Sequence, residues 1–127
     1  MTIAARLKGA LSGNSGVTTL VSTRIYPLKL PQNSTYEAIS YQRISNTPTD
    51  GSTALRNSRW QINCWADTYA ESQALALAVK AALEEYSDTT ATPGIKEGHV
   101  ANEQDDYDDD AKVFRTIVDV ILVTTGD

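Results

Sequence analysis

The sequence has little of what most catalytic and metal sites need. Its 127 residues include one cysteine, Cys64, and one histidine, His99. A lone cysteine excludes an intrachain disulfide and fits a reducing compartment. Catalysis by a Cys–His pair needs the two side chains in contact, and no cysteine or aspartate stands at metal-ligand spacing from His99. We therefore expect His99 to be a structural or surface residue and Cys64 to be a small buried hydrophobe.

Several sequence motifs and long runs are also missing. The sequence contains neither Gly-x-Ser-x-Gly nor the glycine-rich phosphate loops Gly-x-x-x-x-Gly-Lys and Gly-x-Gly-x-x-Gly. It has no run of about 20 apolar residues for a membrane span and no apolar signal-peptide segment. The formal net charge is −5, without the basic patch typical of nucleic-acid binders. We expect no enzyme, no cofactor, no membrane insertion and no specific binding of DNA.

The composition is that of an ordinary folded chain. Hydrophobic residues make up 41%, which is close to the average for globular domains. A chain of this length can bury about two-thirds of the surface that it exposes when unfolded. We therefore expect one domain, residues 1–127, with a core that needs no disulfide.

The N-terminal segment predicts a short helix. In Ile3–Leu11, apolar residues recur with the 3.6-residue period of a helix face. Thr2 is placed to cap the start, and Gly13 follows as a stop. Val17–Val21 predicts a further helical turn. The next segment, Arg24–Thr35, is expected to be irregular because its two prolines remove backbone donors.

A second helix is predicted from Thr68 to Tyr86. Thr68 and Glu71 have the spacing of a capping box, in which each side chain satisfies a backbone donor of the first turn. The apolar face of this helix is expected to pack on a sheet and consists of Leu75, Val79 and Leu83.

Four segments have the composition or the alternation of strands: Tyr36–Ser45, Arg59–Ala66, Ile95–Gln104 and Lys112–Thr125. The first two are joined by a polar loop, Asn46–Ser58, and predict a long antiparallel hairpin. The last segment is apolar on both faces, so we expect a central strand covered on both sides. The order helix-strand-strand-helix-strand-strand predicts an α+β fold, a mostly antiparallel sheet with two helices packed on it.

One acidic run is unusual. It contains the six carboxylates Glu103, Asp105, Asp106, Asp108, Asp109 and Asp110. Closely spaced carboxylates can bind calcium, although the glycine and the terminal glutamate of an EF-hand loop are missing. The run can instead be a solvated turn at Asp105–Asp110, or an electronegative surface that faces a pore or a basic partner. The five aspartates are therefore candidates for an interface or a pore lining.

Several segments, in this order, resemble the tail-completion proteins of long-tailed bacteriophages, also called tail-terminator or head–tail joining proteins. They are Thr23–Pro27 with the following Leu30-Pro31-Gln32, then Ile39–Ser45, then the strand-to-helix unit Trp60–Leu83, and finally the strand Val113–Val123. The similarity extends over most of the chain.

This resemblance implies a small structural subunit that forms a ring, a hexamer, at the head-proximal end of the tail tube. The ring would end tube growth, bind the tail tube protein and present a surface to the head connector or stopper protein. DNA would pass through the centre without specific binding. The protein would be found in the neck region of the virion tail, and in the host cytoplasm during assembly. Alternatives are another neck or tail component, such as a head-completion or tail-tube subunit, and a small metal-binding domain.

Overall fold

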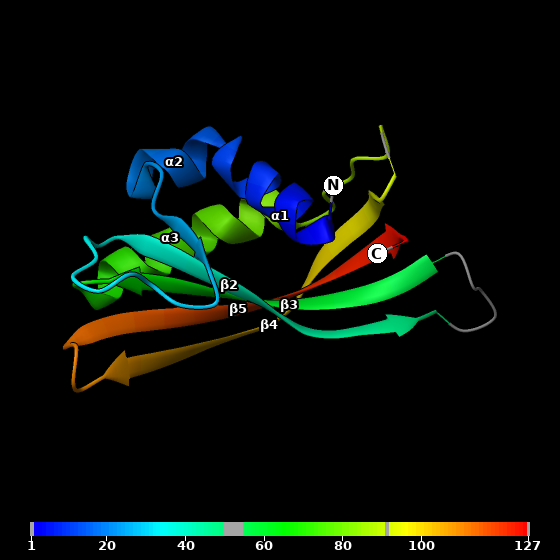
Figure 1. Cartoon of the computed structure of the whole chain (residues 1–127). Helices are drawn as coiled ribbons and strands as arrows, with labels where there is room; N and C mark the ends of the chain where they lie inside the picture. Colours follow the sequence, from blue (N-terminus) through cyan, green and yellow to red (C-terminus); the bar gives the residue numbers. More distant parts are fainter. Residues whose placement is uncertain (1, 50–54, 91, 127) are drawn as a thin grey trace.

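The computed structural model describes residues 2–49, 55–90 and 92–126. Within these residues the chain forms three helices and five strands (Figure 1). In chain order they are α1 (Ile3–Ser12), α2 (Ser15–Val21), β1 (Ile25–Pro27), β2 (Ala38–Pro48), β3 (Leu55–Ala66), α3 (Tyr69–Leu83), β4 (Gly94–Asp108) and β5 (Val113–Thr125).

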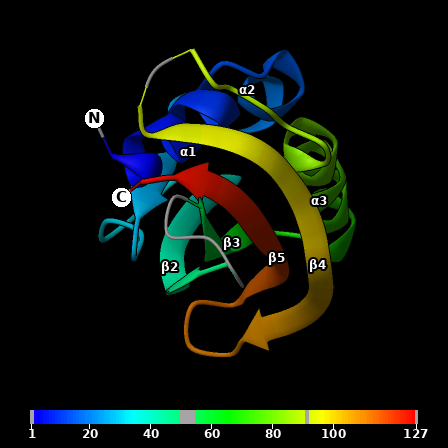
Figure 2. The same cartoon turned by 90° about the vertical axis from the view of Figure 1, so that its right-hand side faces the viewer.

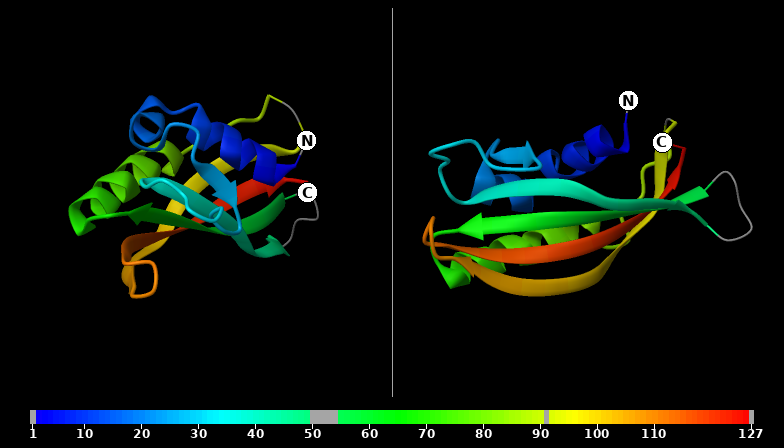
Figure 3. Two further views of the ribbon diagram at one scale, coloured as in Figure 1. Left: turned by 60° about the vertical axis from the view of Figure 1, so that its left-hand side comes forward. Right: turned by 60° about the horizontal axis from the view of Figure 1, so that its bottom comes forward.

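The five strands form one twisted sheet in the order β1-β2-β3-β5-β4. All neighbouring pairs are antiparallel except β1 and β2, which are parallel. In the described part of the chain the helices lie together on one face of the sheet, and we call the face without helices the open face (Figures 1 and 3). The predicted α+β class is confirmed, but the sheet is mixed and carries three helices rather than two.

Two short elements account for the difference. β1 lies in a segment predicted to be irregular, and its register places Ile25 beside Ile39 and Pro27 beside Tyr41. Pro27 is tolerated because it is the last residue of an edge strand, where a missing N–H breaks no ladder. The predicted helical turn at Val17–Val21 is confirmed as part of α2, which Asn14 caps by accepting a hydrogen bond from the Val17 N–H at 3.2 Å.

The two predicted helices are confirmed, with different ends. Thr2 caps α1, its side chain accepting a hydrogen bond from the Ala5 N–H. The Thr68 hydroxyl likewise accepts from the Glu71 N–H at 3.2 Å, but it also donates to the Glu71 carboxylate at 2.9 Å. Helix α3 ends at Leu83, three residues earlier than predicted.

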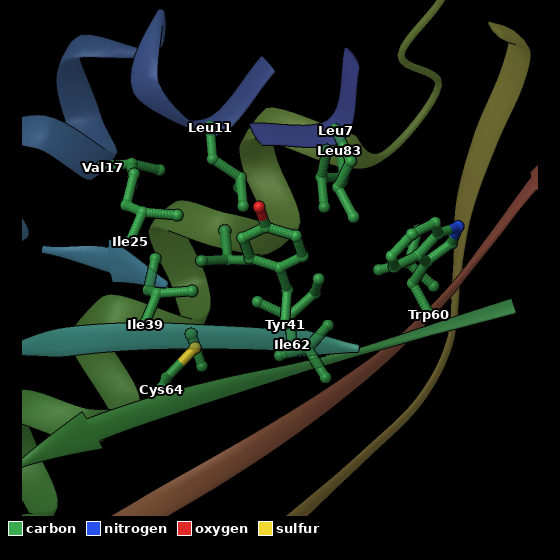
Figure 4. Close-up of a cluster of buried hydrophobic side chains, with 14 of the residues drawn as sticks. Leu7, Leu11, Val17, Ile25, Ile39, Tyr41, Trp60, Ile62, Cys64 and Leu83 are labelled. Atoms are coloured by element: carbon green, nitrogen blue, oxygen red, sulfur yellow. The ribbon is translucent and has the colours of Figure 1, made fainter. Parts of the chain in front are cut away.

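The core lies between the helices and the sheet. The predicted face of α3, Leu75, Val79 and Leu83, is fully buried. Side chains from α1, α2 and the first three strands converge on the same layer (Figure 4). Cys64 is among them, and its burial raises the pKa of the thiol above the ordinary value. The prediction that Cys64 is a buried hydrophobe is confirmed.

The predicted hairpin of β2 and β3 is confirmed, but its loop is shorter than expected. Asn46, Thr47 and Pro48 continue β2 and pair with Ser58, Asn57 and Arg56 of β3. Arg56 supports this extension, because its guanidinium donates to the Asn46 side chain at 3.2 Å. The centre of the predicted loop, residues 50–54, lies outside the described residues.

Strand β5 is central, as predicted, because it pairs with β3 on one side and β4 on the other. Its two faces are covered unequally. Val118, Val120 and Leu122 are buried under the helices, whereas on the open face Val113 and Ile117 are buried but Ile121 and Val123 are only half-buried. The apolar residues on both faces of β5 predict cover on both sides, but the described residues supply helices for one side only.

Candidate functional site

Cys64 and His99 do not come together. Cys64 points to the helix-covered face of β3. His99 pairs in register with Ile121, so it lies on the open face of the sheet. Among the residues that the structure describes, no three histidine, cysteine, aspartate or glutamate side chains are grouped as metal ligands.

The acidic run is not the turn that the sequence predicts. Strand β4 continues to Asp108, so Asp105 and Asp106 are strand residues opposite Thr116 and Arg115. The turn comprises residues 109–112. Aspartate is disfavoured in strands, but here the carboxylates lie on an edge strand, where water and neighbouring donors solvate them.

Asp105 faces the helix layer and connects β4 to α3. Its carboxylate accepts hydrogen bonds from the Tyr69 hydroxyl at 2.8 Å, the Gln73 amide at 2.7 Å and the Thr116 hydroxyl at 3.1 Å. The bond to Asp105 raises the pKa of the Tyr69 phenol. Lys80 and Glu103 form an ion pair at 2.8 Å further along the same seam.

The other aspartates of the run point elsewhere. Asp106 forms an ion pair with Arg115 on the open face, and this hydrogen bond lowers the pKa of the Asp106 carboxyl. Arg115 also lies over the ring of Trp65, 5.0 Å from its centroid. The Asp108 carboxylate accepts from the backbone N–H groups of the turn. Because Asp105, Asp106 and Asp108 diverge and have protein partners, the geometry disfavours a calcium site that these three carboxylates share.

The open face of the sheet is polar at its centre. Asn63 and Trp65 both donate to the Ser40 hydroxyl, at 3.2 and 3.0 Å. Arg59 pairs with Asp119 at 3.2 Å. This face is thus a layer of paired polar groups beside the aliphatic side chains of β5, with Asp106 and Asp108 at its margin.

A groove of about 330 Å³ lies at the opposite edge of the sheet from β4. Leu28, Tyr41, Arg43 and Trp60 line it. Arg43 lies over the Trp60 ring, 4.9 Å from its centroid, so the wall of the groove combines apolar surface with positive charge. Sequence reasoning missed this surface, because only the sheet order brings Leu28 beside β2.

None of the helices in the described part of the chain has the length and apolar content that crossing a bilayer requires. A comparison with curated sequences gives no significant match.

Among solved structures, one chain from the virion of a native gene transfer agent particle has the same fold, with a TM-score of 0.74 at 15% sequence identity. The match covers 94% of this chain and 92% of the other. The model of the family described as tail completion protein gp17 matches residues 5–125. The chain therefore belongs to the tail completion protein gp17 family.

Proposed function

We propose that this protein forms a hexameric ring at the head-proximal end of the phage tail tube, where it ends tube growth and joins the tail to the head connector. The family match across residues 5–125 carries this proposal. A structural role in the tail also fits a chain whose candidate sites are a polar sheet face, an acidic edge and an apolar groove. The partners are further copies of the chain, the tail tube protein and a connector or stopper protein.

The charge of the chain fits a ring through which DNA passes. A formal charge of −5 repels phosphate, so the ring guides DNA without holding it. The acidic residues at the margin of the open face and in the β4–β5 turn supply this repulsion if they face the channel. The protein then acts in the neck region of the virion, after assembly in the host cytoplasm.

Electron microscopy of the purified protein, alone and mixed with isolated tail tubes, tests the proposal. We expect rings that dock on one end of each tube and prevent its further growth. Labelling along the whole tube would instead indicate a tail-tube subunit, and labelling of heads would indicate a head-completion protein. A chain that stays monomeric under both conditions would contradict the ring.

The acidic turn provides a second prediction. Asp109 and Asp110 are exposed, whereas Asp105, Asp106 and Asp108 accept hydrogen bonds within the chain. Changing only Asp109 and Asp110 to Asn therefore removes charge while keeping those bonds. If the turn faces the channel or a basic partner, assembled particles lose infectivity, and the loss varies with salt because charge interactions are screened.

Particle titres at several salt concentrations measure this effect. The matched control combines Asp67→Asn with Glu97→Gln, which also neutralises two exposed carboxylates but does so outside the turn. The control separates a local role of the turn from the effect of net charge alone. Normal titres for the Asp109→Asn, Asp110→Asn particles would show that the turn only keeps the subunit soluble.

A further inference from the structure

The exposed large apolar side chains lie at two opposite edges of the sheet. Among the described residues they are Leu28, Ile44, Tyr69, Leu77 and Tyr107, with exposed fractions from 44% to 70%. Leu28 and Ile44 lie at the edge formed by β1 and β2. The other three lie where α3 runs beside β4, at the far edge of the sheet (Figure 2).

The first group belongs to what we call the β1–β2 surface: Leu28, Lys29, Arg43 and Ile44. The register of β1 ends at Tyr41, so beyond this point β2 is itself the edge. Leu28 and Arg43 line the same groove. This surface is therefore apolar and positively charged.

The backbone of Leu28 is the most informative feature of this surface. Its φ is +66°, a region that leucine rarely adopts and that asparagine or glycine adopts more readily. The Leu28 N–H donates to the Tyr41 carbonyl at 2.8 Å, which holds the turn. With 70% of the residue exposed, packing within the subunit gives no reason for a leucine. Strain of this kind is commonly retained where function requires it.

The second group belongs to the α3–β4 surface: Tyr69, Leu77, Glu103, Asp105 and Tyr107. On α3, Tyr69, Gln73, Leu77 and Lys80 are three or four residues apart and form one stripe of the helix. The bonds of this stripe to Asp105 and Glu103 fix it beside β4. The surface is therefore preorganised, with exposed apolar side chains around the Asp105 carboxylate, whose charge no lysine or arginine of the stripe neutralises.

The two surfaces carry charge of opposite sign. On the α3–β4 surface Glu103 is paired with Lys80, so Asp105 supplies the negative charge, and the hydrogen bonds to Asp105 come from neutral groups. The β1–β2 surface contributes Lys29 and Arg43. Complementary charge on two patches favours their encounter and fixes their register.

The edge of β4 is closed to strand pairing over part of its length. Its register with β5 shifts between Ile95 and Glu97 and again between Val100 and Asn102, and such bulges blunt an edge. The Glu85 N–H donates to the Gly98 carbonyl at 2.7 Å, and the Glu84 carboxylate accepts from the Val100 N–H at 3.2 Å. A partner therefore meets side chains here rather than an open strand.

We propose that the β1–β2 surface of one copy docks on the α3–β4 surface of the next copy. The inference rests on the proposed ring and deepens it by naming the contact between subunits. Because two different surfaces meet, the contact is head-to-tail and repeats around a closed ring. Leu28 is the central apolar anchor on one side, and Leu77 is its counterpart on the other.

Two single variants test the contact without disturbing the fold. Leu28→Asn suits the positive φ, so the monomer should melt no lower than the wild type. Leu77→Gln changes an exposed position of a helix. Each change weakens assembly by about tenfold or more, as expected for an anchor at the centre of an interface. Lys8→Gln, an exposed change on α1 outside both surfaces, leaves assembly unchanged.

Mixing the two variants gives the decisive result. Leu28→Asn keeps an intact α3–β4 surface, and Leu77→Gln keeps an intact β1–β2 surface. An equimolar mixture should therefore give heterodimers that cannot grow, detected by native mass spectrometry at concentrations where the wild type forms rings. If the wild type forms rings and the variants also assemble normally, this contact is wrong, although the proposed ring is not. The same holds if the mixture gives no heterodimers. A wild-type protein that stays monomeric with and without tail tubes would contradict both the ring and this contact.

Discussion

Leu75→Ala is expected to lower the free energy of unfolding by about 2–5 kcal/mol, the usual range for a leucine truncated in a core. Leu75 is fully buried on the face of α3 that packs on the sheet, together with Val79 and Leu83. Truncation removes apolar contact and leaves a cavity that the rigid strands cannot close. Equilibrium unfolding in urea, followed by circular dichroism, measures the loss.

Leu77→Ala is a closely matched control. It is the same substitution, two residues further along the same helix, but Leu77 is 65% exposed. Its effect on stability should stay within about 0.5 kcal/mol, as for most surface positions. A Leu75→Ala protein as stable as the Leu77→Ala protein would place the predicted face of α3 outside the core.

Periodicity predicts the elements that bury one clear face. Helix α3 and strand β3 alternate apolar and polar residues with their own periods, and the pattern places both within three or four residues of their observed ends. It does not find β1, because three residues are too few for a pattern and two prolines argue against a strand. β1 exists because Ile25 enters the core and the chain there pairs with β2.

The acidic end of β4 shows a second limit of local patterns. Asp105 and Asp106 have low strand propensity. Pairing of β4 with the strongly apolar β5 nevertheless extends the β4–β5 hairpin through both residues. Their partners Tyr69 and Arg115 are distant in sequence or on another strand. Long-range contacts therefore override local preference, and the predicted turn is too long.

The candidate surfaces depend on tertiary structure even more strongly. The six carboxylates are visible in the sequence, but nothing local shows that they divide between the helix side and the open face. Leu28 lies in a segment expected to be irregular, and its exposure and positive φ follow from the turn after β1. The family resemblance rests on patterns of buried residues. Such patterns indicate the fold but say little about which edges of the sheet bind a partner.

Gly98→Ala is expected to destabilise the protein by about 1–3 kcal/mol, the usual cost of an added methyl group in a filled site. A Cβ at this position would lie 2.6 Å from the Leu83 carbonyl oxygen and 3.1 Å from Leu122 Cδ2. The Leu83 carbonyl belongs to the backbone, and the hydrogen bond from the Glu85 N–H to the Gly98 carbonyl holds the end of α3 against β4. The Leu83 carbonyl therefore cannot rotate away from the added methyl group. The end of α3 would have to move away from β4. Thermal and urea unfolding measure the cost.

The same substitution at Gly9 should have the opposite sign. Gly9 lies inside α1, and a Cβ there would meet nothing within 4 Å, so Gly9→Ala should stabilise the protein by about 0.5–1 kcal/mol through helix propensity. Equal effects of the two changes would mean that β4 and the end of α3 are less closely packed than described. Because that packing positions the seam of Tyr69, Leu77 and Glu103, a Gly98→Ala subunit that folds should also assemble more weakly, whereas Gly9→Ala should assemble normally.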